Sequence, residues 1–439
     1  MPGCRADAAV ETTLFRMSNW DSGTKVVLYD TEANYRNLLP LSYTRPVGAF
    51  RVGIDTLADK WKAQLPGDYQ WLTRPCLREK FPGEYGAPGE ECVYIAGNVL
   101  ADAELVRQVK QLESGHGLAD VDGLWAWRGT YEQFLSLTDN DATDNIPTGV
   151  IKEKDSRVMD CDTRGRRINY VYDIFLKNEQ ALLEDYHRYC YGRKSNAPDE
   201  STRVIGPMYQ PDGTPSIMIE EGGTVIGATL NVTGGPIYIG KDCQVMEGAC
   251  LRGPIAMLDG TRVRMGAKIY GGTTFGPNCR IGGEVDNTVI FGYSNKAHDG
   301  YLGNAVIGEW CNLGAGCNAS NLKNDYTKIR VWNYARRGFM KTDLQFCGLI
   351  MGDHSKAAIN TMFNTATVVG VGVNFHGAGF PRPFIPSFQT GSPAGFTDVS
   401  VDQFFKVAAV VMGRRGIELT DADRRMFEFI HKSASEFKR

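Results

Sequence analysis

A histidine, a tyrosine and several amide side chains occur together between Asn295 and Asp325. His298 and Tyr301 are three residues apart, and Gly314-Ala315-Gly316 forms a turn whose backbone N–H groups can meet a ligand. An imidazole takes a proton from an attacking amine or hydroxyl, and fixed N–H groups polarise a carbonyl. These residue types suit a general base beside a carbonyl-binding site. The alternative is that His298 only hydrogen-bonds its own loop.

The region around these residues repeats with a period of six. Large apolar residues stand at every sixth position from Ile239 to Ile281, and a small or β-branched residue stands four positions after each of them. This period fits neither an α-helix nor an alternating strand. It predicts a left-handed parallel β-helix, in which three six-residue faces form one coil and each coil buries its large residues against the next.

The β-helix is expected to span residues 217–379. The repeat is interrupted at 287–304 and again at 319–341, and it returns as far as Phe375. Insertions in such a solenoid gather on one edge, which is where function concentrates. A C-terminal tail, residues 380–439, follows with two amphipathic helices at Val401–Met412 and Thr420–Lys432.

The first half of the chain alternates strand and helix patterns. Short apolar runs predict strands, whereas longer periodic segments predict helices; the strands are expected at 25–29, 92–96, 123–127 and 149–152, and the helices at 54–61, 101–112 and 173–191. This alternation predicts a Rossmann-type α/β domain over residues 25–192 with a parallel sheet. Residues 193–216 are expected to be a linker. Residues 1–24 are expected to be a disordered extension or a misassigned start.

Composition narrows the class of protein. A chain of 439 residues exceeds one ordinary core, and a net charge of −3 gives no reason to expect a nucleic-acid partner. No apolar run approaches about 18 residues and no basic-then-apolar leader is present, so no membrane partner and a cytoplasmic location are expected. The 11 cysteines lack CxxC pairs, which predicts packed free thiols and no metal site.

The motifs Lys296-Ala-His298, Tyr301-Leu-Gly303 and Asn312-Leu-Gly-Ala-Gly316 are similar to those of a known family. The chain from about Lys25 to its C-terminus resembles the sugar nucleotidyltransferase branch of the GlmU-like family. That family joins an N-acetylglucosamine-1-phosphate uridyltransferase to a glucosamine-1-phosphate acetyltransferase. The resemblance implies acetyl-CoA as co-substrate, a sugar phosphate or sugar nucleotide as the other substrate, and a homotrimer.

The resemblance also assigns roles to particular residues. His298 matches the histidine that takes the proton from the sugar amine. By the same resemblance, Tyr301, Asn312 and Asn321 are expected to contact the substrate. Ala315, Gly316 and Arg382 are expected to contact acyl-CoA.

Two cations that the family uses for the sugar phosphate are missing here. The arginine of its Arg-Pro-Gly-Thr turn is replaced by Tyr270, and the lysine of a later motif is replaced by Asp286. Lys296, Arg252 or Arg264 are candidates to take their place. The alternative is an acceptor that is not a sugar phosphate.

The α/β domain departs further from the family. The segment after its first strand lacks the glycine-rich phosphate loop. The amide Asn98 stands where the family has a magnesium-binding aspartate, and Arg167 stands where it has a second one. Arg45, Arg51 and Asn98 are the candidate nucleotide contacts, and Mg²⁺ is needed only if this domain is active.

Three interpretations of this domain remain open. It is a degenerate module that still binds a nucleotide or sugar, an active transferase that uses Asp30, Asp102 or Arg51 instead, or a structural module. For the whole chain, the first hypothesis is an acetyl-CoA-dependent acyltransferase that acts on an amino sugar, sugar phosphate or sugar nucleotide. The alternatives are a sugar-1-phosphate nucleotidyltransferase and a non-catalytic sugar-nucleotide-binding scaffold.

Overall fold

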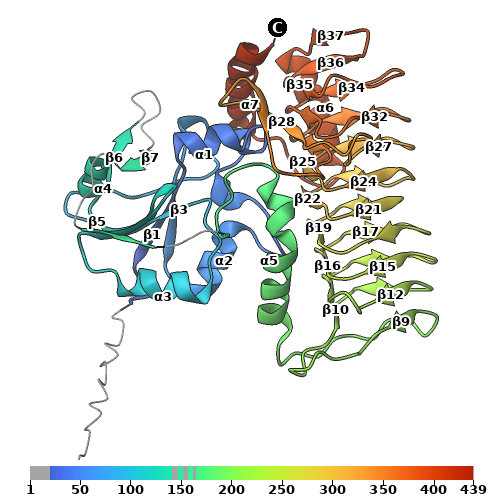
Figure 1. Cartoon of the computed structure of the whole chain (residues 1–439), viewed down its shortest axis with the longest axis horizontal. Coiled ribbons are helices and arrows are strands. Elements are labelled where there is room, and N and C mark those ends of the chain that lie inside the picture. The colour runs from blue at the N-terminus through green and yellow to red at the C-terminus, as the bar shows by residue number, and fades with distance from the viewer. Residues whose placement is uncertain (1–19, 141–146, 152–156, 162–164, 439) are drawn as a thin grey trace, which may run out of the picture.

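The computed structural model describes residues 20–140, 147–151, 157–161 and 165–438. An α/β domain lies beside a long parallel β-helix, and two helices pack near the C-terminal end of that β-helix (Figure 1). The two-part fold predicted from the sequence is confirmed. Residues 1–19, most of the expected N-terminal extension, lie outside the described residues.

The α/β domain contains a six-stranded mixed sheet in the order β2-β1-β3-β5-β4-β8. Its strands are β1 (Lys25–Tyr29), β2 (Asp68–Leu72), β3 (Cys92–Ala96), β4 (His116–Asp120), β5 (Gly123–Gly129) and β8 (Val158–Asp160). The expectation of an all-parallel sheet was wrong, because β5 runs antiparallel to both β3 and β4. Only two residues join β4 to β5, and so short a connection permits only an antiparallel pair.

Five helices surround or follow this sheet. They are α1 (Glu32–Asn37), α2 (Leu57–Gln64), α3 (Ala103–Gln111), α4 (Tyr131–Leu137) and α5 (Asp173–Cys190). The side chains of Thr31, Thr56 and Asp102 accept hydrogen bonds from the first turns of α1, α2 and α3, which fixes where these helices begin. The strand expected at 149–152 corresponds to β7 (Pro147–Ile151), which forms an antiparallel pair with β6 (Thr138–Asn140). Lys152 lies outside the described residues.

The β-helix has three faces, each a stack of parallel strands. Face one comprises β10 (Ile217–Ile219), β13 (Ile237–Ile239), β16 (Ile255–Met257), β19 (Thr273–Phe275), β22 (Val289–Gly292), β25 (Val306–Glu309), β30 (Ile350–Met351), β33 (Val368–Val369) and β35 (Phe384–Ile385). Face two comprises β11 (Thr224–Val225), β14 (Gln244–Val245), β17 (Arg262–Val263), β20 (Arg280–Ile281), β23 (Asn295–Lys296), β26 (Asn312–Leu313), β31 (Lys356–Ala357), β34 (Asn374–Phe375), β36 (Gln389–Ser392) and the antiparallel β37 (Gly395–Asp398). Face three comprises β9 (Arg203–Ile205), β12 (Thr229–Asn231), β15 (Cys250–Arg252), β18 (Lys268–Ile269), β21 (Glu284–Asp286), β24 (Tyr301–Gly303), β27 (Asn318–Ala319) and β32 (Met362–Phe363).

The coils extend further than the six-residue pattern indicated. β9 pairs with β12 inside the segment expected to be a linker, and β35 and β36 continue the stack beyond Gly379. The interruption expected at 287–304 was wrong, because β22, β23 and β24 pair in register with the strands of the coil before them. One coil there is shorter, with Ile281 paired to Lys296, 15 residues later. A shorter turn breaks the sequence period but leaves the strand pairing intact.

The second interruption is a true insertion between β27 and β30. It carries an antiparallel hairpin of β28 (Arg330–Asn333) and β29 (Gly338–Lys341). Tyr334, at its tip, is buried, and its ring meets the ring of Tyr43 edge-on. The insertion therefore adds a contact between the two parts of the chain.

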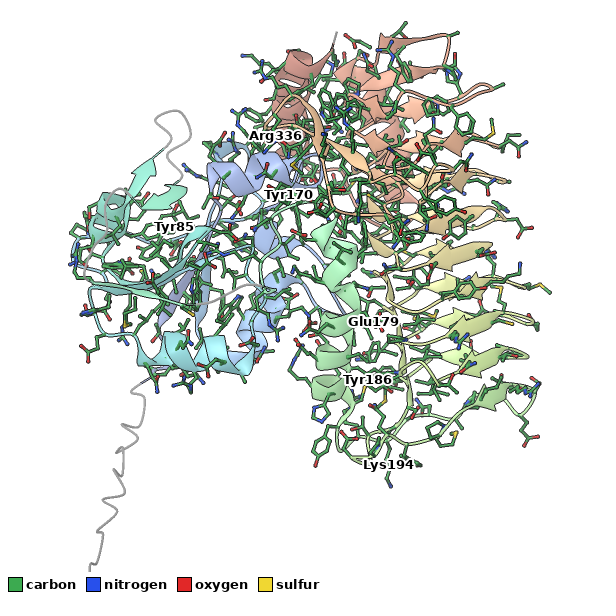
Figure 2. The ribbon with its side chains drawn as sticks, in the orientation of Figure 1. Tyr85, Tyr170, Glu179, Tyr186, Lys194 and Arg336 are labelled. Atoms are coloured by element: carbon green, nitrogen blue, oxygen red, sulfur yellow. The ribbon has the colours of Figure 1, made fainter. Side chains whose placement is uncertain are left out.

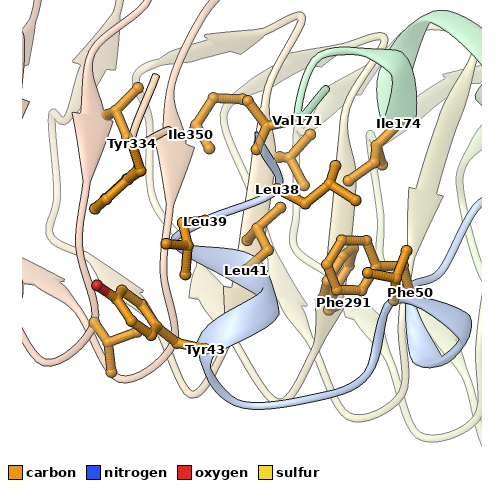
Figure 3. Close-up of a cluster of buried hydrophobic side chains, with 14 of the residues drawn as sticks. Leu38, Leu39, Leu41, Tyr43, Phe50, Val171, Ile174, Phe291, Tyr334 and Ile350 are labelled. Carbon is orange, nitrogen blue, oxygen red and sulfur yellow. The ribbon is translucent and has the colours of Figure 1, made fainter. Parts of the chain in front are cut away.

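Face one is covered by the α/β domain. Figure 3 shows Leu38, Leu41 and Phe50 of that domain near Phe291 and Ile350 of the β-helix. The segment Leu39–Pro46, which contains the candidate nucleotide contact Arg45, thus lies at the interface with the β-helix.

Helix α5 lies along the same face of the β-helix (Figure 1). Asn178 donates from Nδ2 to the Gly272 carbonyl at 2.7 Å and accepts from the Gly53 N–H at 2.7 Å, so it joins both domains. Tyr186, labelled beside the first coils in Figure 2, is buried and donates its hydroxyl to the Pro215 carbonyl at 2.7 Å.

The chain closes with α6 (Val401–Gly413) and α7 (Asp421–Ala434), as predicted. Thr420 and Asp423 form a capping box at the start of α7. Among the described residues, every helix falls short of the length and apolar character needed to cross a bilayer.

Candidate functional site

A column of polar side chains runs along the outside of face two. Each short strand of this face places one residue inward and one outward, and parallel pairing aligns the outward residues from coil to coil. The register pairs Arg280 with Asn295, Asn295 with Asn312, and Asn312 with Lys356. Neighbouring strands are about 4.8 Å apart, so these four side chains occupy successive rungs.

A pocket of about 670 Å³ opens over this column. The turn after β23 contributes His298, the turn after β26 contributes Ala315, and the C-terminal end of α6 closes one side. Its lining residues are Arg264, Arg280, Tyr293, Asn295, Ala297, His298, Trp310, Cys311, Asn312, Leu313, Gly314, Ala315, Lys356, Ile359, Val411, Arg414 and Arg415. Four predicted site residues, Arg264, His298, Asn312 and Ala315, therefore meet in one pocket, whereas Arg252 does not line it.

The position of His298 depends on a lysine inside the β-helix. The side chain of His298 is exposed, and its backbone carbonyl accepts a hydrogen bond from Lys296 Nζ at 2.6 Å. Lys296 occupies the inward position of its rung, next to Ile281, and is 1% exposed. Burial lowers the pKa of Lys296 to about 8. The structure thus places this predicted substrate contact behind the histidine turn.

Among the described residues, the glycine turn contains one amide without a hydrogen-bond partner. The N–H of Gly314 donates to the Ala357 carbonyl at 2.9 Å, and that of Gly316 donates to the Asp299 carbonyl at 3.0 Å. Among the residues that the structure describes, the N–H of Ala315 has no hydrogen-bond partner. Because Ala315 lines the pocket, this N–H is a candidate donor to a carbonyl oxygen bound there.

The charged side chains that line the pocket are all cationic. They are Arg264, Arg280, Lys356, Arg414 and Arg415, together with the titratable His298. Arg280 donates from Nη1 to the backbone carbonyls of Gly260 and Cys279, both at 2.9 Å. The pKa of Arg280 is lowered by burial and by the neighbouring cations Arg415, Arg262 and Arg264. Such a concentration of positive charge favours an anionic ligand.

Tyr301 and Asn321 form a separate cluster at face three. Asn321 donates from Nδ2 to the Tyr301 hydroxyl at 2.9 Å and to Asn304 Oδ1 at 2.7 Å. Burial, followed by the charge of Asp286, raises the pKa of Tyr301 to about 12. Neither residue lines the pocket around His298. Arg382 is exposed over the ring of Phe396 at 5.8 Å and lies outside that pocket as well.

The candidate nucleotide contacts of the α/β domain make internal contacts. Arg45 is buried, forms ion pairs with Asp353 and Glu309 of the β-helix, and links the two domains. Arg51 donates to the Ile54 carbonyl. Asn98 is buried and donates from Nδ2 to Asn169 Oδ1 at 3.0 Å.

The residues that correspond to a magnesium site do not fit that ion. Asp30 accepts from the Thr73 hydroxyl at 2.5 Å and from the Val47 N–H at 2.9 Å, so both of its oxygens are engaged. Arg167 forms an ion pair with Asp120. In the described part of the chain, no three histidine, cysteine or acidic side chains gather as a metal site would require.

Sequence reasoning missed most of the pocket's cations. Arg262 and Arg280 are 18 residues apart, which is three hexapeptides, so this spacing could have placed Arg280 on the outward column. Lys356 lies beyond the insertion, and Arg414 and Arg415 depend on where α6 docks. For these three residues, local sequence carries no signal.

The fold is that of a left-handed parallel β-helix joined to an α/β domain. Residues 26–194 match the family model described as sugar nucleotidyl transferase.

Curated relatives carry the name bifunctional protein GlmU. The protein of Trichodesmium erythraeum is 36% identical over 97 residues, which are 21% of this chain and 20% of that protein. The protein of Trichormus variabilis is 33% identical over 130 residues, which are 27% of this chain and 29% of that protein. The matches thus span less than a third of these relatives. Among solved structures, UDP-N-acetylglucosamine acyltransferase of Francisella novicida matches with a TM-score of 0.32 and 12% sequence identity. The match covers 55% of this chain and 87% of the Francisella novicida chain.

Proposed function

We propose that this protein is an acyltransferase that moves an acetyl group from acetyl-CoA to an amine or hydroxyl of a sugar phosphate or sugar nucleotide. The observation that carries the proposal is the exposed His298 in a pocket with Asn312, the Ala315 amide and only cationic charged neighbours. A general base, a carbonyl-polarising donor and a site for anions are the parts that such a reaction needs.

The chemistry follows from these groups. The acceptor's nitrogen or oxygen attacks the thioester carbonyl while His298 takes its proton. The N–H of Ala315 stabilises the negative charge on the carbonyl oxygen of the tetrahedral intermediate. The carbon–sulfur bond then breaks, and the proton on His298 returns to the departing thiolate. An amide or ester and free CoA are the products.

Asn295 and Asn312 are candidates to orient the acceptor. Their side chains lie on adjacent rungs, with Asn295 Nδ2 at 3.4 Å from Asn312 Oδ1. Tyr301 and Asn321 lie at another face, so any contact that they make involves a different part of the substrate or a neighbouring subunit of a homotrimer. We propose the homotrimer from the family resemblance alone.

The test is release of thiol from acetyl-CoA against amino-sugar phosphates and sugar nucleotides. His298→Ala should lower the rate with the accepted substrate by about 100- to 10,000-fold. His376→Ala is the matched control, because His376 is an exposed histidine on the same β-helix and does not line the pocket. Equal rates for wild type and His298→Ala would show that His298 is not the general base. Absence of transfer with every acceptor, despite bound ligand, would favour a sugar-nucleotide-binding scaffold.

Nucleotidyl transfer by the α/β domain is the second candidate, and the match of residues 26–194 favours it. The internal contacts of Asp30, Asn98 and Arg167 weigh against it. Release of pyrophosphate from UTP and a sugar-1-phosphate, dependent on Mg²⁺, would establish this activity. We expect none above the background of a protein-free reaction.

A further inference from the structure

We propose that the pocket beside His298 binds the diphosphate group of a substrate, and that α6 completes this site within one chain through Arg414 and Arg415. Arg264, Arg280 and Lys356 supply the remaining cations. The inference deepens the proposed function by naming the group that is bound and the residues that bind it. Diphosphate binding itself is measurable without any acetyl transfer.

The cations converge from separate elements. Arg264 follows β17, Arg280 lies on β20 and Lys356 lies on β31, whereas the arginine pair comes from the end of α6. A helix C-terminus favours cations, which would account for Arg414 and Arg415 alone. It does not account for three further cations on the facing coils. A shared anionic ligand accounts for all five.

Within the described part of the chain, the cations of the pocket lack acidic partners. Ion pairs found among the described residues include none with these five side chains. Lys356 Nζ donates to the His354 carbonyl at 2.9 Å, and Arg415 donates to Asn295 Oδ1 at 3.3 Å. The buried Nε of Arg415 has no partner in the part of the chain that the structure describes. A guanidinium with an unused donor, beside other cations, is costly unless an anion joins it.

Helix α6 holds its arginines in a fixed place. Its apolar face is buried, and the ring of Phe404 packs edge-on against Phe388 at 5.1 Å and Phe427 at 4.8 Å. The helix ends at Gly413, so Arg414 and Arg415 emerge directly over the column of face two. A site organised before the ligand arrives loses less freedom on binding.

A diphosphate fits this arrangement in charge and in size. Guanidinium groups pair with phosphate oxygens through two parallel hydrogen bonds, and several cations match the multiple charges of a diphosphate. A volume of about 670 Å³ holds a nucleotide-sized ligand. CoA and sugar nucleotides both contain a diphosphate, so the source of the group is a matter for experiment.

Inorganic pyrophosphate is the probe, measured by calorimetric titration and by its effect on thermal unfolding of the full chain. Wild type should bind it, whereas the double variant R264S/R414S should bind at least about tenfold more weakly. Both side chains are exposed, so their removal spares the core. R203S is the control, because Arg203 is an exposed strand arginine outside the pocket.

The unliganded proteins provide an independent check on folding. Removal of mutually repelling cations should leave the melting temperature of R264S/R414S equal to or above that of wild type. Equal pyrophosphate affinities of wild type and the double variant would overturn the proposal, as would equal losses in the double variant and R203S. CoA and UDP-N-acetylglucosamine, titrated separately, identify the source, and the one that competes with pyrophosphate carries the bound diphosphate. Competition by neither would also overturn the proposal.

Discussion

Lys296 is a charged residue in an apolar column. The inward neighbours on the adjacent rungs are Ile281 and Leu313, and the lysine ammonium donates to the His298 carbonyl at 2.6 Å and to the Gly282 carbonyl at 3.4 Å. A Cβ at Gly283 would lie 2.8 Å from Lys296 Nζ, so this glycine leaves the room that the ammonium needs. The lysine therefore positions the turn that carries the histidine, at a cost in stability.

We expect Lys296→Met to increase the free energy of unfolding at pH 7 by up to about 3 kcal/mol, because a pKa lowered from 10.5 to about 8 reflects a destabilised charge. The unfolded chain binds the proton more tightly, so this penalty is complete below pH 8 and fades as the pH rises towards 10.5. Urea unfolding from pH 7 to 10 should show the variant's advantage shrinking. Acetyl transfer should fall, because the His298 turn loses its donor. A pH-independent difference would contradict this account.

Two buried tyrosines differ in one hydrogen bond. Tyr186 donates its hydroxyl to Pro215, whereas the hydroxyl of Tyr334 has no partner among the described residues. We expect Tyr186→Phe to lower the free energy of unfolding by about 1 kcal/mol and Tyr334→Phe to leave it unchanged or raise it. Chemical denaturation of both variants tests this pair. If both variants lose the same free energy of unfolding, the Tyr334 hydroxyl has a hydrogen-bond partner in solution.

At the scale of elements, the coils were predictable and the site was only half predictable. Every rung gives its inward residue the same surroundings, so the six-residue spacing from Ile239 to Ile281 was enough to predict the β-helix. His298 and Ala315 were predicted from their residue types and from motifs similar to those of the GlmU-like family, because the six-residue spacing breaks at 287–304. Helix α6 was predicted too, but its docking beside Asn295 depends on contacts far apart in the sequence. The same holds for Arg45, which was a candidate nucleotide contact and whose side chain pairs with Asp353 and Glu309 of the β-helix.

Docking of α6 should control ligand binding from a distance. Phe404 is buried between α6 and its neighbours and does not line the pocket beside His298. We expect Phe404→Ala to destabilise the protein by about 3–5 kcal/mol and to weaken pyrophosphate binding, because Arg414 and Arg415 lose their anchor. Val410→Ala on the same helix, where the side chain is 65% exposed, should change stability by less than about 0.5 kcal/mol. Pyrophosphate titration and denaturation of both variants check this. Undiminished binding in Phe404→Ala would mean that α6 is dispensable.

At the scale of the whole molecule, a shared apolar cluster joins the α/β domain to the β-helix, while each part also has a core of its own. The cluster that joins them runs from Leu38 through Phe291 to Phe427 of the last helix. Arg45 lies within this interface, between Asp353 and Glu309, and Thr44 donates to Asp353 Oδ2 at 2.9 Å. Arg45, one of the candidate nucleotide contacts, instead connects the two domains.

We expect Arg45→Ala to lower the free energy of unfolding by about 3–5 kcal/mol, because it leaves the Asp353 carboxylate buried without its cation. Limited proteolysis should cut the variant faster between the domains than it cuts wild type. Arg203→Ala, at an exposed position, should behave as wild type in both measurements. If Arg45→Ala matches that control, the interface does not depend on the ion pair.

The parallel register of face two also spaces the outward side chains evenly along the axis of the β-helix. Each rung displaces an outward side chain by about 4.8 Å along one axis, so the distances between Arg280, Asn295, Asn312 and Lys356 come in whole steps. The insertion after β27 puts the paired Asn312 and Lys356 44 positions apart in sequence, against 17 for Asn295 and Asn312, without changing that step. Duplication of one coil would lengthen the pocket by one strand spacing, and each side chain would keep the same kinds of neighbours. Ligand length in this architecture is thus adjustable in discrete increments.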